Sequence, residues 1–236
     1  MLTPCQNHNS KHRKKRLLVI NPNTSKHVSL LLRDSISGVC GVHSDLDVIT
    51  ARWGASYIVD ERSYAVAAHA ALDTWSNAIQ SQICKPDTVL IGCFGDPGLF
   101  ALKECCDLPV TGLAEASFQQ AAAIGDFAIV TGGRAWAPIL ERIARGTEFG
   151  TALTGIRTVE ATGADLARDA HRAHELLYAA CSEAASIPGV KSVILGGAGL
   201  VGFAKRLQPH FNIPLIDSVR AGAEVALAMA AEPSSG

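Results

Sequence analysis

Two Gly-rich stretches share most of one pattern: VLIGCFGDPG at residues 89–98 and VILGGAGLVG at residues 193–202. Each begins with an aliphatic run of strand length and reaches glycines immediately afterwards, which is typical of a buried strand that ends in a tight turn. The first stretch carries Cys93 where the second carries Gly197. The pattern predicts equivalent strands and turns in two related halves of the chain.

Other segments repeat at nearly the same spacing. Residues 89–95 match residues 193–199 at an offset of 104, and LPVTG at 108–112 matches IPLID at 213–217 at an offset of 105. LVINPN at 18–23 matches AIVTGG at 128–133 more loosely, at an offset of 110. Gly-rich turns after strands are common, but here their position recurs together with their composition. We therefore predict an internal duplication.

Short runs of Val, Ile and Leu alternate with Ala-rich segments of helical length, which indicates parallel strands joined by crossover helices. Strands are predicted near 17–21, 46–50, 87–92, 109–112, 127–131, 153–158, 190–195 and 213–216. Helices are predicted near 25–37, 63–82, 98–106, 115–124, 135–145, 163–186, 199–207 and 218–231. The fold class is therefore α/β, with two pseudo-symmetric lobes that are each a four-stranded parallel sheet flanked by helices.

The first lobe is predicted to comprise residues 17–113 with the C-terminal helix 218–231, and the second lobe residues 114–217. Ligands of open α/β sheets bind beyond the carboxyl ends of the strands. The Gly-rich turns all follow strands, so we expect the active site in the cleft between the lobes.

Residues 1–16 form a predicted disordered basic leader that ends in KHRKKR at 11–16. No apolar stretch of a secretory signal follows, so a cytoplasmic protein is expected, with a nuclear address left open by the basic cluster. Without the leader's five Lys and Arg, the chain has 16 bases against 22 acids and a formal net charge of -6. This charge argues against nucleic acid as a partner.

Composition excludes two further classes of protein. With 236 residues, of which 48% are hydrophobic and 18% charged, the chain buries a sizeable core. No apolar run approaches the roughly 18 to 20 residues of a membrane-spanning helix. The seven cysteines form no CxxC pair and no histidine cluster has zinc spacing, which predicts reduced thiols and no metal site.

The ordered segments resemble the Asp/Glu/hydantoin racemase superfamily, and within it the hydantoin and allantoin racemases. The resemblance covers residues 16–231 and is carried by INPNTS at 20–25, GASYI at 54–58, GCFGDPGL at 92–99, PVTGLAEAS at 109–117, AIVTG at 128–132, LGGAGL at 195–200 and PLIDSV at 214–219. It implies a cofactor-independent racemase or epimerase in which two cysteines face each other across the substrate. The implied partner is a small carboxylate or cyclic imide or ureide, and a homo-oligomer is compatible with the resemblance.

Inverting a stereocentre next to a carbonyl requires an acid/base group on each face of the carbon. Cys93 follows a predicted strand and precedes a predicted helix, with Asp96 expected at the N-cap and Pro97 at the first helical position. A helix N-terminus lowers the pKa of a thiol, so Cys93 is the candidate catalytic thiolate base. The other candidate site residues are expected to bind the substrate. Some would do so through the backbone N–H groups of turns, and others belong to turns that resemble the family's substrate-contacting NPNT turn and its anion-binding turn. These residues are Asn21, Asn23, Phe94, Gly95, Thr131, Gly132, Gly197, Ala198 and Gly199.

The sequence departs from the family at its second catalytic cysteine. The family reads LGCAG, whereas this chain reads LGGAG at residues 195–199, so glycine replaces that thiol. Three alternatives stay open. In the first, the protein is a racemase whose second proton comes from water or from another group such as His210. In the second, it is a single-cysteine lyase, isomerase or cyclase similar to arylmalonate decarboxylases. In the third, it is a binding protein without catalysis. Glu115 and Asp217 fit either helix caps or ligands.

Overall fold

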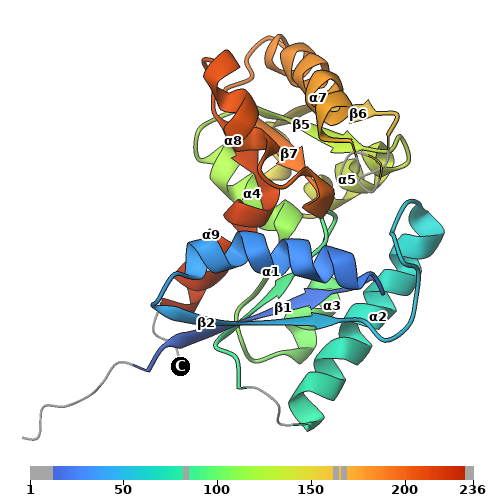
Figure 1. Cartoon of the computed structure of the whole chain (residues 1–236), viewed down its shortest axis with the longest axis vertical. Coiled ribbons are helices and arrows are strands. Elements are labelled where there is room, and N and C mark those ends of the chain that lie inside the picture. The colour runs from blue at the N-terminus through green and yellow to red at the C-terminus, as the bar shows by residue number, and fades with distance from the viewer. Residues whose placement is uncertain (1–12, 82–84, 162–164, 166–168, 232–236) are drawn as a thin grey trace, which may run out of the picture.

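The computed structural model describes residues 13–81, 85–161, 165 and 169–231 (Figure 1). Residues 1–12 of the predicted leader lie outside this part. The first strand, β1 (Lys15–Asn21), begins two residues before its predicted start at residue 17 and includes the last two residues of the predicted leader. The backbone N–H of Arg16 donates to the Asp87 carboxylate at 2.8 Å, which fixes the start of the strand against the segment before β3.

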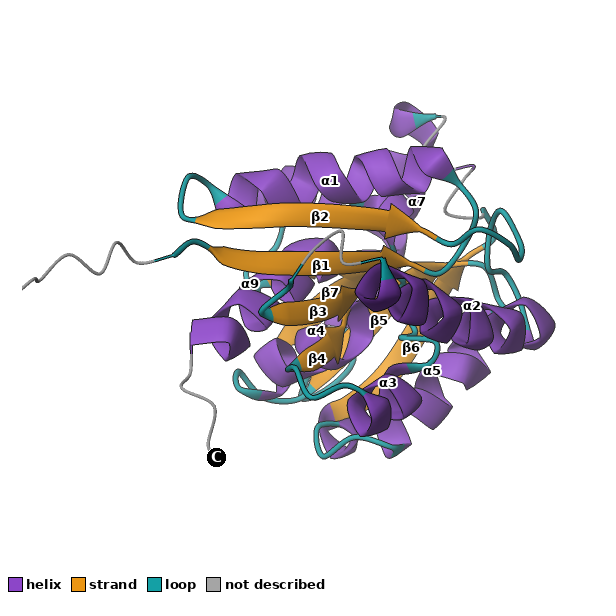
Figure 2. Cartoon of the chain, turned by 90° about the horizontal axis from the view of Figure 1, so that it is seen from below, coloured by secondary structure: helices purple, strands orange, loops and turns teal. Residues whose placement is uncertain are grey.

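The eight strands form two parallel sheets with the same strand order. The first sheet has the order β2-β1-β3-β4 and comprises β1, β2 (Ser44–Thr50), β3 (Thr88–Ile91) and β4 (Val110–Gly112). The second has the order β6-β5-β7-β8 and comprises β5 (Phe127–Gly132), β6 (Leu153–Val159), β7 (Ser192–Gly196) and β8 (Leu215–Asp217). Figure 2 shows the strands of the first sheet side by side. The predicted α/β fold and its duplication are confirmed.

Helices follow the strands in the predicted alternation. They are α1 (Lys26–Cys40), α2 (Glu61–Gln80), α3 (Leu99–Cys105), α4 (Leu113–Ala122), α5 (Trp136–Arg145), α7 (Ala170–Ala185), α8 (Phe203–Leu207) and α9 (Ser218–Ala231). The helix predicted over 199–207 is instead a 3-10 turn, η2 (Ala198–Leu200), followed by α8. Gly202 lies between η2 and α8 and has a φ of 81°. This left-handed backbone conformation prevents one continuous helix.

Alternating side chains of each strand pack against helices on opposite faces of its sheet. Leu17 and Val19 of β1 pack in one cluster with α1 and α9, whereas Leu18 and Ile20 pack in another with α2 and α3. All four side chains are fully buried. Because both faces of the sheet are covered, the strand reads as a continuous aliphatic run rather than an alternating one.

The helices that follow the last strand of each sheet cross between the sheets. α4 follows β4 but contacts β7, and α9 follows β8 but contacts β1 and β3. The two helices also pack on each other, where a Cβ on Gly222 would lie 2.6 Å from Leu113 Cδ2. Figure 1 shows the red C-terminal helix against the blue first lobe. These contacts support a division into two lobes, for which we propose residues 17–113 with 218–231, and residues 114–217.

The described helices include none that is long and apolar enough to cross a membrane.

Candidate active site

A cavity of about 240 Å³ lies between the two lobes. Its walls come from the segments after β1, β2 and β3 of the first sheet and after β5 and β7 of the second. The lining residues are Asn23, His27, Val28, Leu31, Tyr57, Ile58, Val59, Gly92, Cys93, Phe94, Thr131, Gly132, Gly133, Arg134, Ala135, Trp136, Gly196, Gly197, Ala198, Gly199 and Leu200. The site therefore occupies the carboxyl ends of the strands, where the sheet topology places ligands.

Most of the predicted site residues meet in this cavity. Those that line it are Asn23, Cys93, Phe94, Thr131, Gly132, Gly197, Ala198 and Gly199. Asn21 and Gly95 do not line it. The predicted set thus comes together from four separate turns.

Asn21 is a structural residue of the first turn. Its side chain is fully buried, and its Nδ2 donates to Ser29 Oγ at 2.9 Å and to the Ser25 carbonyl at 3.1 Å. Its Oδ1 accepts from the backbone N–H of Asn23 at 3.3 Å. These bonds satisfy the Asn21 amide within the loop. Of the two predicted asparagines, Asn23 is the one that lines the cavity, and its Oδ1 accepts from the backbone N–H of Ser25 at 2.9 Å.

Gly95 is covered by a side chain from the opposite lobe. A Cβ on Gly95 would lie 2.5 Å from Cζ3 of Trp136, and the glycine has a φ of 136°. Its carbonyl accepts a hydrogen bond from the Tyr64 hydroxyl at 2.9 Å, and the rings of Tyr64 and Trp136 meet edge to face. Gly95 therefore holds the turn that carries Cys93 in close contact with the second lobe.

The thiol of Cys93 lies in the cavity wall, two residues after the end of β3. Burial raises its pKa, and the negative charge of Asp96 raises it further. The expected lowering by a helix is wrong, because α3 begins only at Leu99 and its N-cap Gly98 has a φ of 85° and no side-chain cap. The resting protein therefore holds Cys93 as a thiol, not as a thiolate.

Asp96 caps a different helix from the one predicted. Its two carboxylate oxygens accept the backbone N–H groups of Ala114 at 2.9 Å and Glu115 at 2.7 Å, at the start of α4. Its own backbone N–H donates to the Cys93 carbonyl at 3.0 Å. Burial raises the pKa of Asp96 to about 7. Asp96 thus ties the Cys93 turn to the helix that enters the second lobe.

The raised pKa of Cys93 predicts slow alkylation at neutral pH, because the thiolate is the reacting form. At pH 7.5, iodoacetamide is expected to modify the exposed Cys105 at least about tenfold faster than Cys93. Raising the pH should accelerate modification of Cys93. Peptide mass spectrometry over time measures both rates. Equal rates at pH 7.5 would show that Cys93 is already ionised.

Gly197 occupies the place of the missing thiol in an unusual backbone conformation. Its φ is 132°, and apart from its chain neighbours the nearest heavy atom to a Cβ there would be Leu200 Cγ at 3.9 Å. The backbone N–H of Gly197 donates to Ser218 Oγ at 3.1 Å. This N–H is therefore already bonded, contrary to its predicted role in holding a substrate oxygen. The cavity is open on the side of Gly197.

Phe94 joins the two lobes beneath the cavity. Its ring is buried, meets Phe118 edge to face with centroids 6.2 Å apart, and lies so close to Gly196 that a Cβ there would overlap it. Phe94 lines the cavity from this fixed position. Its main contribution is to the core that both lobes share.

Among the lining residues that were not predicted from the sequence, four have polar or aromatic side chains: His27, Tyr57, Arg134 and Trp136. Arg134 is exposed and pairs with Glu160. Tyr57 lies within the GASYI segment, and His27 lies just after the INPNTS segment. Their closeness to these segments could have identified them as site residues. Trp136 begins α5 directly after a Gly-rich turn, a position that the duplication makes equivalent to the start of α1.

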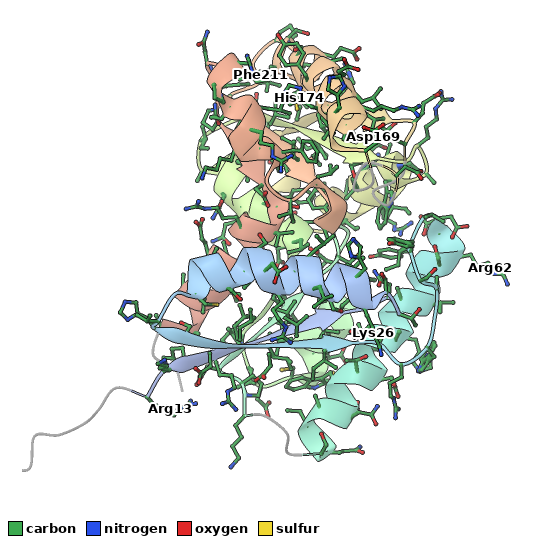
Figure 3. All side chains as sticks on the ribbon, viewed as in Figure 1. Arg13, Lys26, Arg62, Asp169, His174 and Phe211 are labelled. Atoms are coloured by element: carbon green, nitrogen blue, oxygen red, sulfur yellow. The ribbon has the colours of Figure 1, made fainter. Side chains whose placement is uncertain are left out.

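Other candidate residues lie outside the cavity. His210 is exposed, and its ring contacts those of His174 and Tyr178 on the second lobe. In Figure 3, the labelled residues His174 and Phe211 lie at the end of the second lobe that is distant from the first lobe. The proposal of His210 as a proton source is therefore wrong, because α8 and η3 (Gln208–His210) carry it away from the cleft.

Glu115 and Asp217 act at helix starts. Glu115 accepts from Lys103 Nζ at 2.6 Å and from Thr111 Oγ1 at 3.1 Å. Asp217 accepts the backbone N–H groups of Val219 at 3.0 Å and Gly202 at 2.8 Å. Neither lines the cavity. Asp217 is therefore a helix cap, whereas among the described residues the Glu115 side chain forms an ion pair with Lys103 and caps no backbone N–H group.

Metal-binding groups are not assembled in the described part of the chain, where no cluster of three His, Cys, Asp or Glu side chains has a suitable arrangement. The described cysteines, Cys40, Cys93, Cys105, Cys106 and Cys181, are all free.

Two parallel sheets of equal strand order with a cavity between their loops define a class of two-lobed α/β proteins with a small-molecule site between the lobes. Within that class, the family model described as Asp/Glu/Hydantoin racemase matches residues 17–226, and the chain belongs to this family. A hydantoin racemase of Paenarthrobacter aurescens is 32% identical over 217 residues, which are 92% of this chain and 91% of the relative.

Solved structures agree. The allantoin racemase from Klebsiella pneumoniae superposes with a TM-score of 0.85 at 26% identity and covers 92% of this chain and 88% of its own. The allantoin racemase from Pseudomonas fluorescens superposes with a TM-score of 0.84 at 20% identity, over 94% of this chain and 98% of its own, and shares the fold.

Proposed function

We propose that this protein is a cofactor-independent racemase or epimerase of a hydantoin-like or amino-acid-like substrate, with Cys93 as a proton-transferring group. The observation that carries the proposal is the position of the Cys93 thiol in the wall of the interlobe cavity, in a chain that belongs to the Asp/Glu/hydantoin racemase family. The names of the hydantoin and allantoin racemases to which it is similar support a cyclic ureide over other substrates.

The chemistry is a proton transfer at the carbon next to a carbonyl. One group removes the proton, the electron pair moves onto the carbonyl oxygen as an enolate, and a proton added to the opposite face completes inversion. Because the Cys93 thiol is protonated at rest, it begins as the proton donor for one enantiomer. The resulting thiolate is then the base for the other enantiomer.

The cavity wall favours an uncharged or anionic ring over a cationic amine. No carboxylate lines the cavity among the described residues, whereas His27 and Arg134 do. Apolar side chains, including those of Leu31, Ile58 and Trp136, form much of the remaining wall. Such a surface suits an apolar substituent beside a planar ureide whose oxygens meet polar groups.

A second candidate function is that of a single-cysteine lyase, isomerase or cyclase. The observation that favours it is Gly197, because a glycine offers no side chain to move a proton on the face opposite Cys93. A decarboxylation needs only one positioned proton donor after the carbon–carbon bond breaks.

Enantiopure substrates distinguish these functions. The protein is incubated separately with D- and L-5-substituted hydantoins, D- and L-allantoin, D- and L-aspartate, D- and L-glutamate, and an arylmalonate. Chiral chromatography is expected to show that a hydantoin becomes racemic from either enantiomer. Release of CO₂ from the arylmalonate, with every enantiomer left unchanged, would contradict the racemase and support the lyase.

A further inference from the structure

The second-lobe side of the cavity holds no free acid/base side chain among the described residues. Thr131 is buried and its hydroxyl donates to the Gly196 carbonyl at 2.8 Å. Arginine side chains do not act as proton acceptors in proteins, and Arg134 pairs with Glu160. The remaining lining residues of this lobe are glycines, alanines, Leu200 and Trp136. A proton for the face opposite Cys93 must therefore come from the first lobe or from water.

His27 of the first lobe lines the cavity together with residues of the second lobe. It is the second residue of α1, whose first turn is marked by Lys26 in Figure 3. α1 contacts η2, the turn that directly follows Gly197, and His27 lines the cavity together with that turn. Leu31, one helical turn further on the same face, also lines the cavity, so this face of α1 is directed at the site.

The imidazole of His27 is available for chemistry. The residue is exposed, and the described part of the chain offers it no hydrogen bond, ion pair or ring contact. Histidine is the side chain that most readily takes up and releases a proton near neutral pH. Gly197 has no side chain, and apart from its chain neighbours the nearest heavy atom to a Cβ there would be Leu200 Cγ at 3.9 Å. This space leaves room for a substrate to approach the imidazole.

We propose that His27 transfers the proton on the face of the substrate opposite Cys93, in place of the thiol that glycine replaces at position 197. The inference rests on the proposed racemase function, and it makes His27 a catalytic residue of the same site. It also resolves the conflict between a racemase family and a site with one cysteine.

The proton balance is complete with these two groups. Neutral His27 removes the proton at carbon α, and the electron pair of the broken C–H bond passes to the carbonyl oxygen. The pair returns to form a new C–H bond on the other face with the proton of the Cys93 thiol. The site is left with imidazolium and thiolate, which is the form that converts the opposite enantiomer. Exchange with water also restores the resting form.

The main competitor within the cavity is Tyr57, whose phenol also belongs to the first lobe. A phenol with a pKa near 10 is a poor proton acceptor at neutral pH. Of the two side chains, the imidazole of His27 is therefore the better proton acceptor.

The test uses the full-length protein with His27→Gln, and with His43→Gln as the matched control, since His43 is an exposed histidine beyond the other end of α1. Each enantiomer of a 5-substituted hydantoin is incubated separately in D₂O. His27→Gln should lose inversion at least about 100-fold, the usual contribution of an acid/base group. The enantiomer whose α-proton faces Cys93 should still exchange it with retention of configuration, at a rate that rises with pH as the thiol ionises. Added imidazole should restore inversion.

The outcomes separate the two proposals. Inversion by His27→Gln within about twofold of the unaltered protein would overturn the role of His27 while leaving the racemase intact. Equal loss of exchange from both enantiomers without rescue by imidazole would also overturn it, since that is the result of a structural defect. Absence of exchange and inversion in the unaltered protein would refute the racemase itself.

Discussion

Replacing Cys93 by Ala is expected to reduce inversion of a hydantoin by about 10³-fold or more. A positioned acid/base group contributes 10²- to 10⁴-fold, and here the same thiol donates in one direction and accepts in the other, so both directions lose it. Chiral chromatography of reactions started from each enantiomer measures the loss. Both rates should fall together, because the D-to-L and L-to-D rates are linked through the equilibrium constant near 1.

The matched control for this change is Cys105→Ala. Cys105 is an exposed thiol on α3 and does not line the cavity, so its variant should retain full activity. Cys93→Ala should still gain thermal stability with bound substrate, since the rest of the wall is unchanged. A Cys93→Ser variant as active as the unaltered protein would contradict the account and favour a protein in which the thiol has no chemical role.

Replacing Gly196 by Ala is expected to destabilise the protein by about 1–3 kcal/mol, the usual cost of overpacking a core. The added methyl group would overlap the Phe94 ring, which is buried between the lobes and held against Phe118. For a domain of this size, the melting temperature should fall by about 2–4 °C per kcal/mol. Because Phe94 directly follows Cys93, the displaced ring should also misplace the thiol and reduce inversion.

The same substitution at Gly38 is the control. Gly38 lies within α1, and a Cβ there would meet no atom within 4 Å. Gly38→Ala should raise stability by up to about 1 kcal/mol, because alanine favours a helix over glycine. Differential scanning calorimetry compares the two variants. A Gly196→Ala protein that melts at the temperature of the unaltered protein would show that Phe94 moves aside freely and that the contact between the lobes is loose.

The sequence predicted the architecture because the information is local. Each strand is buried on both faces and therefore reads as an aliphatic run, as in the fully buried run at Leu17 to Ile20. The duplication then placed the turns that carry Cys93 and Gly197 at equivalent ends of two sheets. Gly98 and Gly202, which match at the same offset of 104, have φ angles of 85° and 81° and both precede short helices.

Contacts between distant segments were not predictable in this way. Asp96 stands two residues before Gly98 and was expected to cap the helix that follows, but its carboxylate reaches α4 instead. The pKa of Cys93 depends on burial by both lobes, which no local pattern encodes. His210 is close in sequence to the second Gly-rich turn, yet α8 and η3 lead the chain away from the cavity before it is reached.

The most direct measurement is ¹H NMR of an enantiopure 5-substituted hydantoin in D₂O with the unaltered protein, corrected for spontaneous exchange in a sample without protein. Proton transfer at carbon α predicts that the signal of the α-proton disappears, and that the optical rotation decays at a comparable rate. A signal that persists at the spontaneous rate with every hydantoin, allantoin and amino acid tested would contradict the account.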